Sequence, residues 1–132
     1  MLVPKDLKYT KSHEWIKIAG EEAIVGITDY AQEELGEVVF VEMPDINSYV
    51  EEGSSIGVIE SIKSVSEIYA PLSGMVKEVN NNFSDQPQLI NQSPYDKGWI
   101  LKIQIDSKEF PREYEGLLSA EEYVDEVGGA TA

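Results

Sequence analysis

The sequence predicts a mainly β protein whose core is a sandwich or a barrel-like sheet, with short helices added to it. Short runs rich in β-branched and aromatic residues recur at regular spacing, separated by turns that contain glycine, proline or asparagine. Helical patterns occur only as short insertions and near the C-terminus. Because 132 residues suit one core and not two, we expect a single domain over residues 1–127, followed by a tail of small residues over 128–132.

Extended runs follow one another along most of the chain, and two pairs of them are predicted to form β-hairpins. In the first pair, the connecting loop 19–22 contains a glycine, which is typical of a hairpin. In the second pair, the tetrapeptide Ser61-Ile62-Lys63-Ser64 separates the runs and places Lys63 near the tip. Pro44 ends another run, because proline has no amide hydrogen to donate to a ladder. The expected strands are residues 15–18, 23–27, 38–41, 55–60, 65–70, 75–79 and 99–105.

Capping patterns predict two helices. Asp29 is a candidate N-cap with Gln32 as its capping-box partner, and Gly36 stands where a left-handed residue commonly ends a helix. Near the C-terminus, Ser119 and Glu122 form a second capping box. The remaining helical predictions are one turn at residues 88–90 and an end of the terminal helix at Gly128-Gly129.

The composition excludes several classes of function. The chain has 10 Lys and Arg against 25 Asp and Glu, a formal net charge of −15, which argues against nucleic acid and anionic membranes as partners. With no cysteine, it has no disulfide framework, thiolate nucleophile or thiolate metal site. The single histidine, His13, cannot supply a two-histidine metal site, and we interpret it as a polar residue at a strand edge. We therefore predict no metal site.

The N-terminal residues lack the basic segment and apolar stretch of a signal peptide. No apolar run approaches the ~20 residues that a membrane span needs. We therefore expect an unprocessed chain that works in the cytoplasm.

Lys63 is unusual because of the charges around it. It is the only basic residue between Lys17 and Lys77, an interval that holds twelve acidic residues. One interpretation is a solvated lysine at a hairpin tip. A second is a Schiff-base nucleophile, which requires a lowered amine pKa, whereas the neighbouring Glu60 and Glu67 favour the charged amine. A third is an acceptor for a covalently attached prosthetic group, since an isolated, protruding amine on a rigid turn meets that requirement.

Several segments closely resemble the H proteins of the glycine cleavage system, and the resemblance covers nearly the whole chain. The family usually has valine at the position of Ile62 and alanine at that of Ser64, and both differences leave Lys63 and the preceding Glu60-Ser61 intact. The segments that carry the resemblance are residues 12–15, 25–36, 39–44, 57–64, 68–74 and 91–99.

The resemblance implies a lipoyl carrier with the barrel-sandwich hybrid (hammerhead) fold, in which two antiparallel sheets pack together and lipoic acid is attached covalently to Lys63. Such a protein catalyses nothing alone. It carries an aminomethyl group from the glycine decarboxylase (P protein) to the aminomethyltransferase (T protein), and dihydrolipoamide dehydrogenase (L protein) reoxidises the arm. A lipoate-attaching enzyme is a further implied partner.

In the family, the loaded arm folds back against the carrier. The matching positions in this chain are Ser12, Glu14 and Glu67, where carboxylates would attract or hydrogen-bond an amine. Glu67 stands where aspartate is also common. An alternative for all three residues is that they are surface groups without a dedicated role.

Other functions stay open on the sequence. A biotin carrier would have methionines beside the lysine, and Ile62 and Ser64 are not methionines. A lipoyl domain of a 2-oxoacid dehydrogenase would more often have aspartate before the lysine and a tether to a large catalytic chain. The alternatives retained are an H-like carrier that relays lipoate to other enzymes and an unmodified acidic interaction domain.

Overall fold

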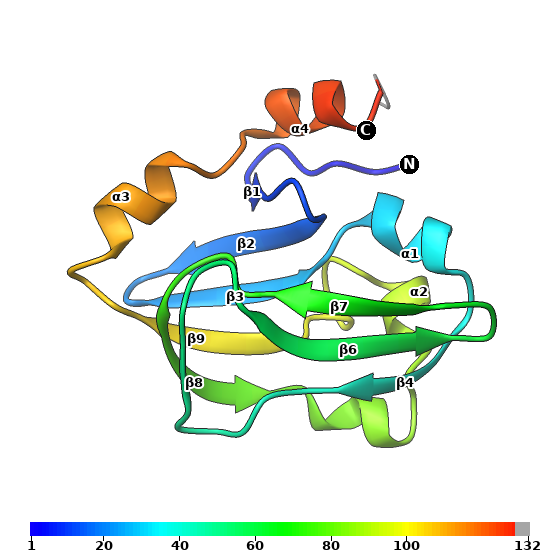
Figure 1. Cartoon of the computed structure of the whole chain (residues 1–132). Coiled ribbons are helices and arrows are strands. Elements are labelled where there is room, and N and C mark those ends of the chain that lie inside the picture. Colours follow the sequence, from blue (N-terminus) through cyan, green and yellow to red (C-terminus); the bar gives the residue numbers. More distant parts are fainter. Residues whose placement is uncertain (129–132) are drawn as a thin grey trace.

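The computed structural model describes residues 1–128, whose strands form two antiparallel sheets (Figure 1). The larger sheet has the order β1-β2-β3-β9-β8-β5, and the smaller has the order β4-β6-β7. The strands are β1 (Lys8–Tyr9), β2 (Glu14–Ala19), β3 (Glu22–Ile27), β4 (Val38–Glu42), β5 (Tyr49–Val50), β6 (Ser55–Ser61), β7 (Val65–Tyr69), β8 (Gly74–Val79) and β9 (Leu101–Ile105). The helices are α1 (Asp29–Leu35), the 3₁₀-helix η1 (Asn81–Ser84), α2 (Leu89–Gln92), α3 (Phe110–Glu115) and α4 (Ala120–Glu126).

The prediction of a mainly β protein with two antiparallel sheets, short helices and a C-terminal helix is confirmed. Both predicted hairpins form, as β2–β3 and β6–β7. The first hairpin is tighter than the predicted loop 19–22, because Ala19 pairs with Glu22 and Gly20 supplies the left-handed turn residue with φ of 65°. The predicted carrier domain over residues 1–127 stays a prediction, and residues 129–132 of the expected tail lie outside the described part of the chain.

The main core lies between the two sheets. Successive side chains of a strand point to opposite faces of its sheet, and the inward faces of both sheets contribute branched aliphatic residues to this core. The core includes Val25 and Ile27 of β3, Ile59 of β6 and Ile68 of β7, all buried. Burying one such side chain stabilises the fold by about 1.5–3 kcal/mol. A second cluster joins Tyr9 to Tyr123 and places α4 beside the N-terminal segment (Figure 1).

The predicted cap of α1 is wrong by one residue. Thr28 has an extended backbone, and its Oγ1 accepts a hydrogen bond from the amide of Ala31 at 3.2 Å, so Thr28 is the N-cap. Asp29 is the first helical residue, and its carboxylate accepts from Gln32 Nε2 at 2.7 Å. The predicted end at Gly36 is confirmed, with φ of 81°.

The terminal helix agrees with its predicted capping box. Ser119 Oγ accepts from the amide of Glu122 at 3.2 Å, and Glu122 Oε1 accepts from the amide of Ser119 at 2.8 Å. Other boundaries differ from the sequence-based ones. Strand β9 begins at Leu101 and not at Trp99, and β1, β5 and α3 were not predicted. No helix within residues 1–128 is both long and apolar enough to cross a membrane.

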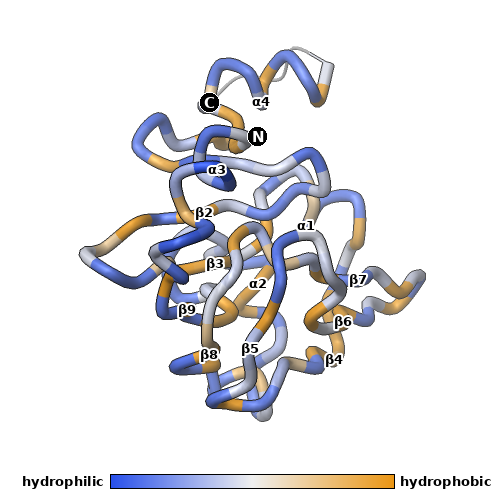
Figure 2. The backbone as a smooth tube through the Cα atoms, turned by 60° about the vertical axis from the view of Figure 1, so that its left-hand side comes forward, coloured by the Kyte–Doolittle hydropathy of each residue, from blue (hydrophilic) through white to orange (hydrophobic). Residues whose placement is uncertain are grey.

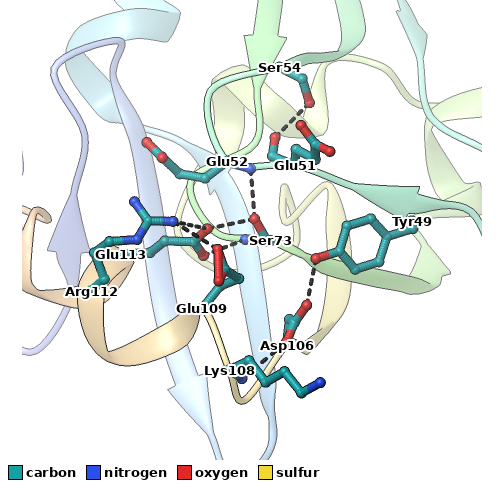
Figure 3. Close-up of polar contacts among 10 residues, drawn as sticks. All are labelled: Tyr49, Glu51, Glu52, Ser54, Ser73, Asp106, Lys108, Glu109, Arg112 and Glu113. Atoms are coloured by element: carbon teal, nitrogen blue, oxygen red, sulfur yellow. Dashed lines mark hydrogen bonds and ion pairs between the residues drawn. The ribbon is translucent and has the colours of Figure 1, made fainter.

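Helix α3 is attached to the larger sheet through the buried carboxylate of Glu113 (Figure 3). This carboxylate accepts hydrogen bonds from the amide of Ser73 at 2.8 Å and from Ser73 Oγ at 2.6 Å. Ser73 Oγ in turn accepts from the amide of Glu52 at 2.9 Å, and Arg112 lies 3.6 Å from the carboxylate. The side chains of Glu113 and Ser73 together therefore link α3, the start of β8 and the turn before β6.

Replacing Glu113 with alanine is expected to lower the free energy of unfolding by about 2 kcal/mol, because the Ser73 amide would be left buried without an acceptor. Urea denaturation measures the loss. Glu115→Ala, on the same helix and exposed, is the matched control and is expected to change stability by less than about 0.5 kcal/mol. Equal stability of the two variants would contradict the assignment of Glu113 as the anchor of α3.

Candidate functional site

Lys63 lies at the tip of the β6–β7 hairpin, in a turn that is closed by hydrogen bonds. Glu60 pairs with Val65, and the amide of Ser61 donates to the carbonyl of Ser64 at 2.8 Å. Ser61 Oγ accepts from the amides of Ser64 at 3.1 Å and of Lys63 at 3.3 Å. The side chain of Ser61 thus fixes the backbone that carries the lysine.

The hairpin tip projects from the body of the protein, as Figure 2 shows. Lys63 is exposed, and its neighbours Ile62 and Val65 are 70% and 65% exposed. Within residues 1–128 the ion pairs are made by Lys102 and Arg112, so Lys63 has none. Its amine is therefore open to another molecule.

A cleft of about 360 Å³ opens beside the hairpin. Its lining combines apolar side chains with polar ones from the segment before β2, from α1 and from β7. Ser12, Glu14 and Glu67, the three residues expected to contact a loaded arm, all line this cleft, together with Ser64, which follows Lys63 in sequence. The structure therefore brings together residues that are far apart along the chain, next to the candidate attachment lysine.

Glu14 is the most deeply placed acid of the cleft. Its side chain is almost fully buried, with 1% of the residue exposed, and its carboxylate accepts three hydrogen bonds. The donors are Thr10 Oγ1 at 2.5 Å, Ser12 Oγ at 2.6 Å and the amide of Tyr69 at 3.1 Å. Burial raises the pKa of Glu14, and these hydrogen bonds oppose the rise because they favour the carboxylate.

Ser12 and Glu67 are exposed at the edges of the cleft. Ser12 Oγ donates its hydrogen to Glu14, so its oxygen lone pairs remain available as acceptors. Glu67 accepts from Ser55 Oγ at 3.0 Å and from Tyr69 Oη at 2.9 Å, which holds its carboxylate in place. Within residues 1–128 no group of three or more His, Cys, Asp or Glu is arranged to hold a metal ion.

His13 also lines the cleft, which the interpretation as a plain strand-edge residue did not anticipate. It adopts a left-handed conformation with φ of 74°, its Nδ1 lies 2.8 Å from Tyr123 Oη, and its ring packs against Tyr30. Burial lowers the pKa of His13, and the nearby Glu126 and Glu34 oppose that shift.

The lowered pKa of His13 predicts a pH dependence of stability. A histidine whose folded-state pKa lies below its ordinary value of 6.5 contributes stability that is complete above that value and is lost as the pH falls below it. His13→Asn keeps a residue that tolerates the left-handed backbone and removes the titrating ring. We expect the variant to lose less stability than the wild type between about pH 7.5 and about pH 5.5 in urea denaturation. The same pH dependence in both proteins would show that His13 does not contribute.

Fold and site together define a class, a small β domain of two sheets that presents one exposed lysine on a hairpin beside a polar cleft. Comparison with known proteins identifies the family within this class. The family model described as "Glycine cleavage H-protein" matches residues 7–129. The chain belongs to this family.

Individual relatives agree with that assignment over nearly the whole chain. The glycine cleavage system H proteins of Staphylococcus carnosus and Staphylococcus saprophyticus are each 46% identical over 128 residues, which is 97% of this chain and 99% of each relative. The crystal structure of a glycine cleavage system H protein from Mycobacterium marinum superposes with a TM-score of 0.83 at 38% identity, covering 96% of this chain and 99% of that one. The fold expected from the sequence resemblance is thereby confirmed.

Proposed function

We propose that this protein is the lipoyl carrier of a glycine cleavage system, with lipoic acid attached covalently to Lys63. In this role it takes an aminomethyl group from the glycine decarboxylase P protein and delivers it to the aminomethyltransferase T protein, and the L protein reoxidises the arm. The observation that supports the proposal most directly is the exposed amine of Lys63, which has no ion-pair partner within residues 1–128 and stands on a hydrogen-bonded turn.

The residues around Lys63 fit such a group. Acylation by a carboxylic acid needs an amine that another enzyme can reach, and the hairpin tip provides one. The adjacent cleft offers apolar walls at Leu35 and Ile59, and polar atoms at Ser12, Glu14 and Glu67. A bound lipoyl group would supply a disulfide that can be reduced and can then hold the one-carbon unit. The chain itself has no cysteine and so cannot supply such a disulfide.

The polar residues of the cleft suit recognition of an amine. Glu14 is fixed by three hydrogen bonds in a site shielded from water, where a cation would pair with its carboxylate more strongly than at the surface. A cation there would also favour the ionised form of Glu14 against the effect of burial. We infer that Ser12, Glu14 and Glu67 hold the amine end of the loaded arm and keep it out of bulk water.

The role is that of a carrier and not of an enzyme. One tethered group presented to several active sites reaches a high effective concentration at each without being released. The acidic surface, with a formal net charge of −15, would speed encounters with partner enzymes that carry basic docking patches. The curated relatives come from bacteria, and we place this carrier in the cytoplasm.

A reconstituted exchange assay tests the function. The chain is first incubated with lipoate, ATP and a lipoate ligase, and intact mass is expected to show one added lipoyl group. The product is then mixed with P protein, labelled bicarbonate and glycine, and label is expected to enter glycine. A protein that takes no adduct would contradict the carrier role, and a lipoylated protein that supports no exchange would favour lipoate relay to other enzymes.

A further inference from the structure

We propose that Asn91 is a positioning residue for the attachment lysine, because its side chain holds the backbone segment on which the tip of the β6–β7 hairpin rests. The inference rests on the proposed function for the identity of Lys63 as the modified residue. It adds a residue on α2 that lies outside both the hairpin and the polar wall of the cleft.

The hairpin tip is not supported by its own hydrogen bonds alone. The amide of Ile62 donates to the carbonyl of Glu37 at 3.0 Å, so the tip is tied to the segment between α1 and β4. The side chain of Lys63 runs over Gly36, where a Cβ atom would stand 3.2 Å from its Cε and 3.7 Å from its Cδ. Residues 36–38 therefore form a seat for the tip, and Gly36 leaves room for the lysine methylenes.

Asn91 fixes this seat on both sides of Glu37. Its Nδ2 donates to the carbonyl of Gly36 at 2.8 Å, and its Oδ1 accepts from the amide of Val38 at 2.9 Å. The second Nδ2 hydrogen goes to Gln32 Oε1 at 3.0 Å, so both donors and the acceptor of the amide are used. Glu37, whose carbonyl holds Ile62, lies between the two peptide groups that Asn91 binds.

The consequence concerns how the lysine is presented to an enzyme. A tip that is already ordered loses little conformational entropy when it docks on an enzyme. A loosened tip must be ordered at each encounter, which weakens binding. Without the Asn91 side chain, the Gly36 carbonyl and the Val38 amide lose their partner and the seat loosens. The change is expected mainly in the KM for the carrier as substrate, since the chemistry after docking is unaltered.

The variant Asn91→Ala tests the inference against Asn80→Ala as a matched control. Asn80 also makes three side-chain hydrogen bonds, to the carbonyls of Lys97 and Trp99 and from the amide of Asn82, and none of them involves residues 36–38 or the hairpin tip. Each variant loses three side-chain hydrogen bonds, and Asn80 is the more buried of the two residues, so a purely structural role would affect Asn80→Ala at least as strongly as Asn91→Ala.

With a lipoate ligase, lipoate and ATP, at a temperature where both variants are folded, Asn91→Ala is expected to lose about ten-fold in kcat/KM, mostly through KM. Asn80→Ala is expected to keep the wild-type value. Equal kcat/KM for Asn91→Ala and wild type, or an equal loss in both variants, would overturn the inference.

Hydrogen exchange of the Ile62 amide provides a second readout that needs no lipoate. Its protection is expected to fall about ten-fold in Asn91→Ala and to stay unchanged in Asn80→Ala. Unchanged protection of the Ile62 amide in Asn91→Ala would contradict the claim that Asn91 orders residues 36–38 and the hairpin tip. A wild-type chain that takes no lipoyl adduct would overturn the proposed function instead, and the exchange measurement would still decide whether Asn91 orders the tip.

Discussion

Lys63→Arg is expected to abolish lipoylation completely and to reduce glycine exchange to the level measured without carrier. Arginine keeps the positive charge and the length of the side chain, but its guanidinium is not acylated by an enzyme built for an amine. Because Lys63 is exposed and forms no ion pair within residues 1–128, the fold loses no ion pair. Intact mass after incubation with ligase measures the adduct, and circular dichroism with urea denaturation measures the fold.

Lys77→Arg is a suitable control, since Lys77 is an exposed lysine on β8. It is expected to accept one lipoyl group at the wild-type rate and to support exchange. An adduct on the Lys63→Arg variant, or transfer of the aminomethyl group by that variant, would show that another residue carries the arm.

Gly74→Ala is expected to have the largest effect on stability, a loss of about 3 kcal/mol or more. Gly74 lies at the start of β8 and pairs with Val50 on one side and Ile105 on the other. A Cβ atom there would come within 2.1 Å of the carbonyl oxygen of Gln104 and 2.5 Å of Ile103 Cγ2. Since the first of these atoms belongs to the backbone, β8 and β9 would have to separate locally.

The matched control is Gly116→Ala, after α3, where the nearest atom to a Cβ would be the Glu113 carbonyl oxygen at an ordinary 3.5 Å. Its backbone φ of −81° suits alanine, so we expect a change within about 0.5 kcal/mol. Thermal unfolding of the two variants makes the comparison. A Gly74→Ala protein as stable as Gly116→Ala would mean that the two strands adjust at little cost.

Local patterns in the sequence were sufficient to predict the hairpin that carries Lys63. Two extended runs, residues 55–60 and 65–70, flank the tetrapeptide 61–64 and predict the hairpin, and the isolation of one base among acidic residues marks the lysine. The capping box of Ser119 and Glu122 was equally local, because both hydrogen bonds run within one helical turn. At α1, two consecutive residues carry oxygen acceptors, and only the extended backbone of Thr28 decides that it, and not Asp29, is the cap.

The cleft and the seat depend on contacts that local patterns do not contain. Glu14 accepts from the amide of Tyr69, 55 residues later, and Asn91 binds backbone groups 53 and 55 residues earlier. These contacts form because the packing of the two sheets brings the start of β2 next to the end of β7, and α2 next to residues 36–38. Sequence reasoning could place Glu14 on a strand, but the three donors that surround its buried carboxylate are evident only in the folded chain.

The order of the larger sheet also bears on when the protein can be modified during its synthesis. Strand β9, formed by residues 101–105, is the last strand in the chain and yet lies between β3 and β8, so that sheet stays in two parts until this segment has left the ribosome. The hairpin closes locally and early, but Asn91, which orders its seat, is translated about thirty residues after the lysine. A ligase that reads the seated tip would therefore act less efficiently on nascent chains than on released, fully folded ones.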